Sequence, residues 1–295
     1  MKHGFLISAY RNGKTILEQI NLLDSPDSYF YIHIDKKSPL FNDPVMQGLK
    51  AKENIIFLEN RIKVNWGGFS HLQAIIYLIR EALKNKELAY LHLMSDSCCP
   101  IKSRKEIFDF FEKNRGKEFI EFVQLPSPNW YGGGLNRITH FHLHDFINLK
   151  SKLKRRIEKY FVKLQELVGV KRTLPTNFST FYGGCTWWTL TRNFLEYAIN
   201  FIDNNPRFYL RFKHSFCAEE ILIHTLLLNS PFKDNVINDN LRYIDWENRN
   251  GNRPANLDDS DLPILLNSKK LYARKFVYPL SYTLLKGIKE KMHND

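Results

Sequence analysis

The feature that most limits how this chain can fold is the alternation of short apolar runs with amphipathic segments in its first part. Four runs rich in β-branched and aromatic residues are typical of strands, at 3–10, 28–35, 54–59 and 89–95. Segments with helical spacing of apolar residues lie between or after them, at 13–22, 71–85 and 103–114. This alternation predicts an α/β fold with a mostly parallel central sheet flanked by helices.

The composition is that of a folded protein. The chain has 295 residues, of which 43% are hydrophobic and 25% charged, so it can bury a sizeable core. Disordered and collagen-like classes are therefore excluded. Without an internal repeat or a linker rich in Pro and Ser, residues 1–295 are expected to form one domain that carries an insertion.

The predicted strands end in residues that suit a binding site. Asp35 follows the second strand, a Trp66–Gly68 turn precedes the 71–85 helix, and Ser95–Asp96 ends the fourth strand. In open α/β sheets, ligands bind beyond the carboxyl ends of the strands. We therefore expect a site at this edge, and we expect Ser70 to cap the helix after the turn.

The positive charge is confined to two segments. The net charge is +12, of which residues 149–172 carry +7 and residues 269–295 carry +5. The first segment predicts a basic amphipathic helix over 149–168, with apolar residues at Leu149, Leu153, Ile157, Tyr160, Phe161, Leu164 and Leu167. Such a helix can cover a core, lie on an anionic membrane or bind another anionic partner, including nucleic acid.

The cysteines and the N-terminus indicate an intracellular location. Cys98, Cys99, Cys185 and Cys217 show no CxxC spacing, so neither a disulfide framework nor a zinc site is suggested. The N-terminal residues contain no long apolar stretch of the kind that forms a signal peptide.

Two adjacent acids are candidates for acid–base chemistry. Glu219 and Glu220, in "CAEEILIHTLLLNS", are expected to open an apolar helix of about ten residues. They can be ordinary charges at a helix N-terminus, or one of them can act as a general base.

Two adjacent cations are candidates for anion binding. Arg274 and Lys275 lie between aromatic residues in the strand-like run "LYARKF". They can neutralise a diphosphate, or they can belong to a surface edge strand.

A third pattern concerns metal. "THFHLHDF" would place His140, His142 and His144 on one face of a strand, an arrangement that can bind zinc in a hydrolase. The acidic "DDSD" at 258–261 is expected to cap a short helix instead.

Seven motifs follow one another from about residue 3 to 277: "YIHIDKKSP", "VNWGGFS", "LHLMSDSCCPIKS", "FYGGCTWWTLTRNF", "EEILIHTLLLNSPF", "RYIDW" and "LYARKF". This ordered set resembles the Core-2/I-branching β-1,6-N-acetylglucosaminyltransferase family, whose relatives include protein xylosyltransferases. The resemblance implies a GT-A-like glycosyltransferase fold that works without a divalent metal. The absence of an Asp-x-Asp motif beside the lone Asp96 agrees with this, so no metal and no other cofactor is expected.

The resemblance also implies roles for individual residues. It makes Glu220 the catalytic base, Arg274 and Lys275 the diphosphate ligands, and Arg253 a further phosphate ligand. Residues 1–125 would form the nucleotide-binding half, and residues 126–295 the acceptor and catalytic half. The nucleotide would lie near Asp35 and Trp66, and the acceptor near Glu121, Trp187 and Trp246. Trp187, Trp188 and Trp246 offer flat faces for sugars, or they pack in the core.

Two positions depart from the family pattern. Xylosyltransferases carry an Asp before the aromatic pair that follows "GG", whereas this chain has Thr186 before Trp187 and Trp188. Cys98 stands where the family often has an Asp after the fourth strand. The first departure favours N-acetylglucosamine over xylose.

These observations predict an inverting glycosyltransferase that moves N-acetylglucosamine from a UDP donor to a hydroxyl of a glycan or lipid-linked glycan, forming a β-linkage. The alternative donor is UDP-xylose. More remote alternatives are the metal-dependent hydrolase and a basic module that binds anionic lipid or nucleic acid. The animal enzymes have a Golgi membrane anchor and disulfides. This chain is instead expected to be a bacterial-type cytoplasmic enzyme of polysaccharide biosynthesis, with peripheral membrane contact left open.

Overall fold

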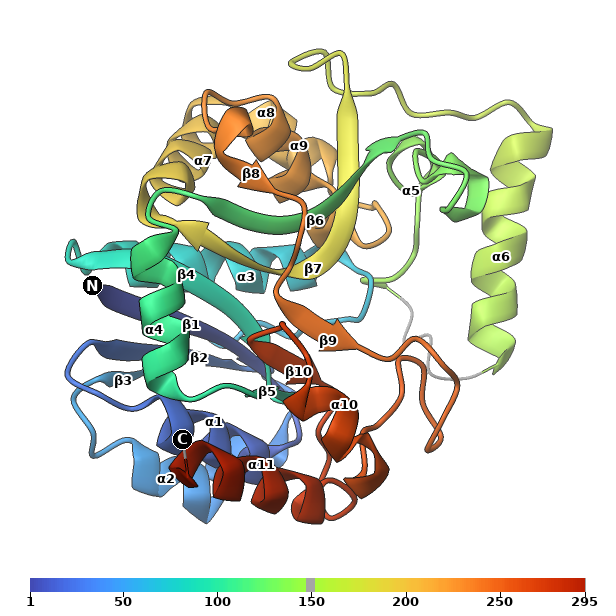
Figure 1. Ribbon diagram of the computed structural model, residues 1–295. Coiled ribbons are helices and arrows are strands. Elements are labelled where there is room, and N and C mark those ends of the chain that lie inside the picture. Colours follow the sequence, from blue (N-terminus) through green and yellow to red (C-terminus); the bar gives the residue numbers. More distant parts are fainter. Residues whose placement is uncertain (147–151, 295) are drawn as a thin grey trace.

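The computed structural model describes residues 1–146 and 152–294 and is built on a seven-stranded sheet (Figure 1). Its strands lie in the order β3-β2-β1-β4-β7-β6-β8. Every neighbouring pair is parallel except those of β7, which runs antiparallel to both β4 and β6. The α/β prediction is therefore confirmed. The strands are β1 (Lys2–Ala9), β2 (Ser28–Ile34), β3 (Ile55–Phe57), β4 (Leu88–Ser95), β6 (Glu118–Leu125), β7 (Phe181–Thr191) and β8 (Val236–Ile237).

Helices bury both faces of this sheet, as the continuous apolar runs of its parallel strands require. Successive residues of β1 show the division: Leu6 packs into one core with α3 and α7, and Phe5 packs into the other with α1 and α4. The helices of the two faces and of the connections are α1 (Gly13–Leu23), α2 (Pro44–Leu49), α3 (Phe69–Leu83), α4 (Arg104–Lys113), α5 (Asn136–Thr139), α7 (Arg192–Asn204), α8 (Pro206–Arg211) and α9 (Leu222–Leu228).

A second sheet of three strands has the order β5-β10-β9 and its own apolar core. Because β10 is its central strand, the alternative of a surface edge strand for "LYARKF" is wrong. Cys98, on β5, is fully buried rather than exposed in a binding site. The elements are β5 (Cys98–Pro100), β9 (Arg242–Ile244) and β10 (Tyr272–Arg274), packed against α10 (Leu262–Leu266) and α11 (Tyr282–Asn294).

The early strands and helices lie within one or two residues of their predicted ends, but the histidine row does not form a strand. Residues 140–146 are irregular and follow the short helix α5. The cap of α3 also differs from the prediction, because its N-cap residue is Gly68 rather than Ser70. The Asp145 carboxylate accepts the Ser70 N–H at 3.3 Å and so serves this helix end. A Cβ at position 68 would collide with that carboxylate.

The basic helix exists as α6 (Lys152–Leu167) and stands apart from the sheet in Figure 1. Leu149 lies outside the described residues. No helix within 1–146 and 152–294 combines the length and the apolar composition needed to cross a membrane. Short 3₁₀ turns complete the described chain at η1 (Pro39–Asn42), η2 (Tyr131–Gly133), η3 (Ala218–Glu220), η4 (Lys233–Asn235) and η5 (Asp259–Asp261).

Gly184 on β7 allows a close approach that an alanine would block. A Cβ there would collide with the backbone oxygen of Glu121 and lie 2.8 Å from Nε2 of His224. We expect Gly184→Ala to lower the free energy of unfolding by roughly 1–3 kcal/mol, the cost of overpacking, in urea denaturation. Gly48→Ala is the matched control, because nothing lies within 4 Å of its Cβ. Equal stability of the two variants would contradict this packing.

Candidate active site

Asp96 holds together the edge of the sheet where a ligand was expected. Its Oδ2 accepts the backbone N–H groups of Tyr10 and Arg11, each at 2.8 Å, and that of Asn12 at 3.3 Å. Asp35 has a similar role after β2, where its Oδ1 accepts the Lys37 N–H at 2.9 Å. Both acids shape loops at the carboxyl ends of the strands, so the predicted edge exists and carries backbone-bound carboxylates.

Three cations gather beside this edge. Burial, together with the charges of Arg274 and Arg11, lowers the pKa of Lys275 to about 8. Among the described residues, no carboxylate lies within ion-pair distance of Lys275 or Arg274. A group of cations that lack acidic partners, two of which depress the pKa of the third, is suited to an anionic ligand.

Arg274 is held by an aromatic face instead of by an acid. Its guanidinium lies 4.6 Å from the ring centroid of Trp187, and both side chains are buried. Its Nε is buried without a hydrogen-bond partner. The stacking leaves the N–H groups of Arg274 available to an anion.

Cys185 on β7 marks the place where the predicted groups meet. Burial raises the pKa of its thiol to about 11, and the charges of Arg274, Glu121 and Glu220 also act on it. Glu121 comes from β6, whose pairing with β7 is irregular at this point, and its Oε2 accepts a hydrogen bond from Asn240 at 2.6 Å. Burial raises the pKa of Glu121 as well. The structure thus brings the predicted base, acceptor acid and diphosphate ligand around one residue.

Glu220 is held by two partners but remains accessible. Its Oε2 accepts a hydrogen bond from Nη1 of Arg137 at 2.5 Å, and its Oε1 accepts one from Thr186 at 3.3 Å. Burial raises the pKa of Glu220, the neighbouring Glu219 raises it further, and Arg137 opposes both. A raised pKa makes this carboxylate a stronger base than an exposed one.

The geometry favours Glu220 over Glu219 as the reactive acid. The Glu219 side chain is only 4% exposed and pairs with Nδ1 of His71 at 2.9 Å, whereas the Glu220 side chain is 26% exposed. The expected helix of ten residues is wrong in its start. The two acids lie in η3, and α9 begins only at Leu222 after non-helical backbone at Ile221. The acids are therefore not charges in the first turn of an α-helix.

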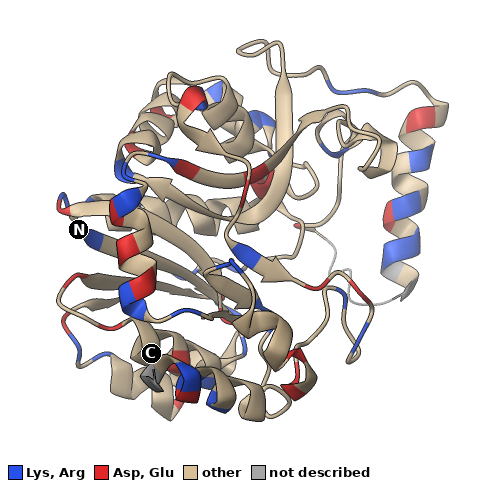
Figure 2. Ribbon diagram, viewed as in Figure 1, with Lys and Arg blue, Asp and Glu red and all other residues tan. Residues whose placement is uncertain are grey.

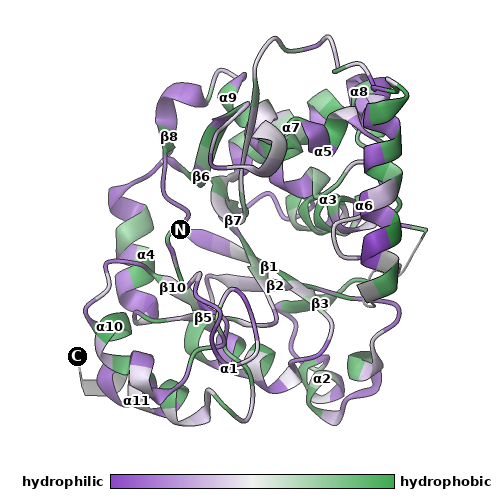
Figure 3. Cartoon of the chain, turned by 90° about the vertical axis from the view of Figure 1, so that its right-hand side faces the viewer, coloured by the Kyte–Doolittle hydropathy of each residue, from purple (hydrophilic) through white to green (hydrophobic). Residues whose placement is uncertain are grey.

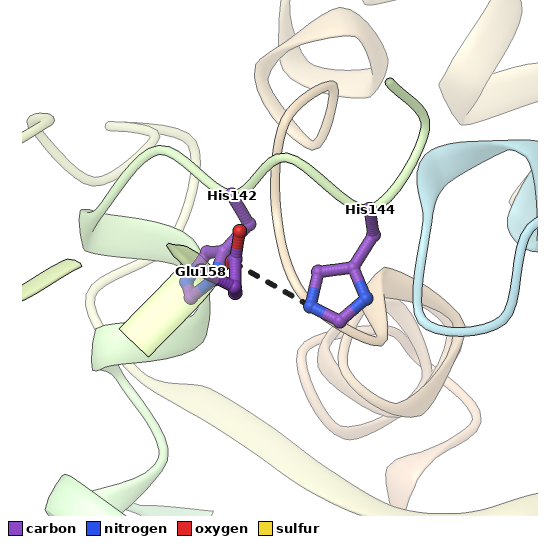
Figure 4. Close-up of side chains that lie close together, drawn as sticks. All are labelled: His142, His144 and Glu158. Carbon is purple, nitrogen blue, oxygen red and sulfur yellow. Dashed lines mark hydrogen bonds and ion pairs between the residues drawn. The ribbon is translucent and has the colours of Figure 1, made fainter. Parts of the chain in front are cut away.

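The histidine row binds a helix. The Glu158 carboxylate of α6 lies 2.9 Å from Nδ1 of His142 and 3.6 Å from Nε2 of His144 (Figure 4). The exposed ring of Trp66 packs against His144 and Phe216, with centroids 6.1 and 5.6 Å apart. Trp66 therefore lies at the junction between the turn before α3 and the histidine loop.

His140 does not share the Glu158 contact. Its Nδ1 lies 3.3 Å from the Asn136 carbonyl oxygen, so the row is not the three-histidine face that was expected. The ligand atoms of His142, His144 and Glu158 lie within 4.8 Å of one another and could hold a metal, as could those of Cys217, Glu219 and Glu220.

The remaining predicted residues lie in the loop after β9 or in the core. Arg253 donates its Nε–H to the carbonyl oxygen of Trp246 at 3.0 Å, and both side chains are exposed. Trp188 is 1% exposed and belongs to the core. The structure therefore separates the three tryptophans: Trp187 lies under Arg274, Trp188 is internal, and Trp246 is on the surface.

The "DDSD" segment was expected to cap the helix at "LPILLNS", but it caps its own 3₁₀ turn, and Asp261 at the start of α10 makes no side-chain capping hydrogen bond to that helix. Asp258 and Asp261 form a reciprocal capping box around η5. Both acids also bind Arg249, at 3.0 and 2.6 Å. Both carboxylates are thus already paired with a cation of the chain.

Three residues of this region were missed by the sequence reasoning: Arg137, Arg11 and Cys185. Arg137 follows the glycine run at 132–134 and lies in α5, which is too short to show helical periodicity, and Arg11 lies in the loop after the first strand. Arg11 could have been identified only by its place directly after a predicted strand, where ligands bind in open α/β sheets.

A family model described as "Branch: Core-2/I-Branching enzyme" matches residues 4–264. The chain belongs to this family. The matched range includes Glu220 and ends before Arg274. Membership supports glycosyl transfer as the class of chemistry.

Curated relatives are xylosyltransferases. This family member is 26% identical over 228 residues to "Xylosyltransferase 2" of Canis lupus familiaris, which covers 76% of this chain and 24% of that protein. It is 26% identical over 250 residues to "Xylosyltransferase sqv-6" of Caenorhabditis elegans, covering 84% of this chain and 28% of that one. The chain thus spans about a quarter of the length of these relatives.

Solved structures give a weaker likeness. The crystal structure of S. aureus TarS aligns with 48% of this chain and 25% of its own, at 17% identity and a TM-score of 0.28. A score this low carries no argument, so the fold rests on the sheet topology described above.

The three cations predict anion binding that depends on pH. An anion beside Lys275 favours its charged form, so binding raises a pKa that is about 8 in the free protein. Below that pH the proton is already present. Above it binding must take up a proton, and affinity falls by up to about tenfold per pH unit. Titration calorimetry with pyrophosphate between pH 7 and about 9.5 measures this.

Lys275→Met should bind pyrophosphate weakly and without the pH dependence. Lys269→Met is the control, because Lys269 is exposed on the loop before β10. If both variants keep the wild-type pH profile, Lys275 does not bind the anion.

Proposed function

We propose that this protein is an inverting, GT-A-type glycosyltransferase that transfers a sugar from a UDP donor to a hydroxyl of a glycan acceptor. The observation that carries the proposal is the meeting around Cys185 of Glu220, whose pKa is raised, and Arg274, a cation without an acidic partner. Residues 1–125 would form the nucleotide-binding half, and residues 126–295 the acceptor and catalytic half.

Glu220 acts as the general base. Its carboxylate accepts the proton of the acceptor hydroxyl while that oxygen attacks the anomeric carbon, and the bond from that carbon to the diphosphate oxygen breaks. Attack on the face opposite the leaving UDP converts an α-linked donor into a β-linked product. Arg137 and Thr186 orient the carboxylate, and the raised pKa of Glu220 matches the need for a base.

Arg274 and Lys275 stabilise the leaving diphosphate. Its negative charge grows as the glycosidic bond breaks, and fixed cations lower the energy of that transition state most. In other enzymes a divalent ion performs this task. Arg11 adds a third positive charge near Lys275, whose pKa it lowers. Arg253 is proposed as a further ligand, from the loop that also carries Trp246.

The donor and acceptor assignments follow the resemblance to the family. Asp35 and Trp66 are proposed to contact the nucleotide, and Glu121, Trp187 and Trp246 the acceptor. N-acetylglucosamine is the proposed sugar, because Thr186 replaces the Asp that xylosyltransferases carry there. The curated relatives favour UDP-xylose as the second candidate. A cytoplasmic enzyme that builds a polysaccharide is the proposed setting.

Glu220→Gln should slow sugar transfer by roughly 10²-fold or more and leave UDP affinity nearly unchanged, because the amide keeps the side-chain volume but cannot accept the proton. UDP release from UDP-N-acetylglucosamine and UDP-xylose measures turnover and also identifies the donor. Glu219→Gln is the comparison, and its loss of the His71 ion pair should affect stability more than turnover. If Glu219→Gln abolishes transfer in a folded protein while Glu220→Gln does not, the base is misassigned.

Activity should not require a divalent metal, because cations of the chain neutralise the diphosphate. We expect UDP release to continue at the same rate after dialysis against EDTA, with no strict dependence on Mn²⁺ or Mg²⁺. Loss of activity in EDTA that Mn²⁺ restores would overturn this mechanism. It would direct attention to the cluster of Cys217, Glu219 and Glu220.

A further inference from the structure

Helix α6 is attached to the protein by its polar residues. The Glu158 carboxylate binds His142 at 2.9 Å and accepts the backbone N–H of Leu143 at 3.0 Å. Two turns further on, Gln165 accepts the N–H of Phe141 at 2.7 Å and donates to its carbonyl oxygen at 2.9 Å. Among the helix residues whose side chains are described, Glu158 and Gln165 are the buried ones (Figure 4 shows Glu158).

The apolar stripe of α6 faces away from this attachment. The stripe consists of five apolar residues, spaced at i, i+4, i+7, i+11 and i+14 from Leu153 to Leu167, so they lie on one side of the helix. Their exposed fractions are 67% for Leu153, 44% for Ile157, 62% for Tyr160, 56% for Leu164 and 83% for Leu167. Helices on globular proteins normally bury such a stripe. Figure 3 turns α6 toward the viewer and shows hydrophobic segments along its length.

Cations border the stripe on its open side. Arg156 and Lys163 neighbour it on the helix surface, and Arg155 and Lys159 follow around the same side, all of them exposed. Residues 152–172 contain eight Lys or Arg and two Glu, which gives a net charge of +6. Figure 2 shows Lys and Arg residues along α6.

We propose that α6 docks the protein on an anionic lipid bilayer. The apolar stripe would enter the boundary between headgroups and acyl chains, and the cations would contact anionic headgroups. A second copy of this chain suits the surface less well, because it would bring together two helices that each carry six Lys or Arg and two Glu, a net charge of +4. Because Glu158 and Gln165 hold the helix through hydrogen bonds on its other side, the apolar stripe can face the bilayer while those hydrogen bonds stay in place.

The attachment of α6 reaches the candidate active site through a short series of contacts. The His144 ring stacks on Phe216 with centroids 4.5 Å apart, and the Arg137 guanidinium lies 5.1 Å from the Phe216 ring. Arg137 in turn binds Glu220. If the proposed function holds, a bilayer at α6 places a lipid-linked acceptor beside the base, and this step alone rests on that function.

Vesicle flotation tests the docking without any substrate. We expect the wild-type protein to float with vesicles of equal parts phosphatidylcholine and phosphatidylglycerol at low salt. High salt should weaken this binding, and vesicles of phosphatidylcholine alone should bind far less. The triple variant Leu153→Ser, Ile157→Ser and Leu164→Ser should bind at least about tenfold more weakly. The double variant Arg156→Glu and Lys163→Glu should lose binding in the same way.

The control variant is Leu210→Ser, Ile264→Ser and Leu280→Ser, which removes three exposed apolar side chains elsewhere and should bind like the wild type. Unchanged thermal unfolding would show that each variant folds. Equal binding by the α6 triple variant would overturn the proposal, as would the absence of binding at low salt. A dimer that dissociates in this variant, without vesicle binding, would also overturn it and assign the stripe to a second copy. Pyrophosphate titration of the same samples tests the anion site separately.

Discussion

The close approach of β7 to β6 and α9 at Gly184 is the constraint on which the candidate site depends. Without a Cβ at this position, the backbone of Glu121 and the ring of His224 can both lie against β7. The residues that follow Gly184 then reach two other elements. Thr186 contacts Glu220 in η3, and Trp187 supports Arg274 of β10. The site is therefore assembled around one strand whose packing has no room for a side chain at one point.

Two buried arginines, Arg242 and Arg274, differ in how their side chains are bound, and this difference distinguishes a structural role from a binding role. Arg242 donates hydrogen bonds to Thr189 and to the carbonyl oxygens of Leu93 and Trp188, so its charge is used within the fold. The Nε of each arginine is buried without a partner, but the guanidinium of Arg274 stacks on Trp187 where that of Arg242 donates these hydrogen bonds. Burying a cation without partners costs stability. A chain that retains such a group beside a second cation, Lys275, is organised for an anionic ligand.

Helix α6 shows why the pattern of a helix does not decide how it docks. The spacing of its apolar residues correctly predicted an amphipathic helix. A core-facing apolar stripe would have been the ordinary outcome. Instead Glu158 and Gln165 supply the buried contacts, since the irregular histidine loop offers ring nitrogens and backbone groups rather than an apolar surface. The partner surface, rather than the helix, determined which side became buried.

The sequence by itself determined the alternating strands and helices, because side-chain periodicity within a segment reflects which faces are buried. Its ordered motifs also sufficed to indicate the family and to single out Glu220, Arg274 and Lys275. Only the tertiary structure decided that Arg137, 83 positions from Glu220, binds that carboxylate. It also decided that β10 is a central strand and that the histidine loop holds α6. Such contacts join segments far apart in the chain, and no local pattern records which of them will meet.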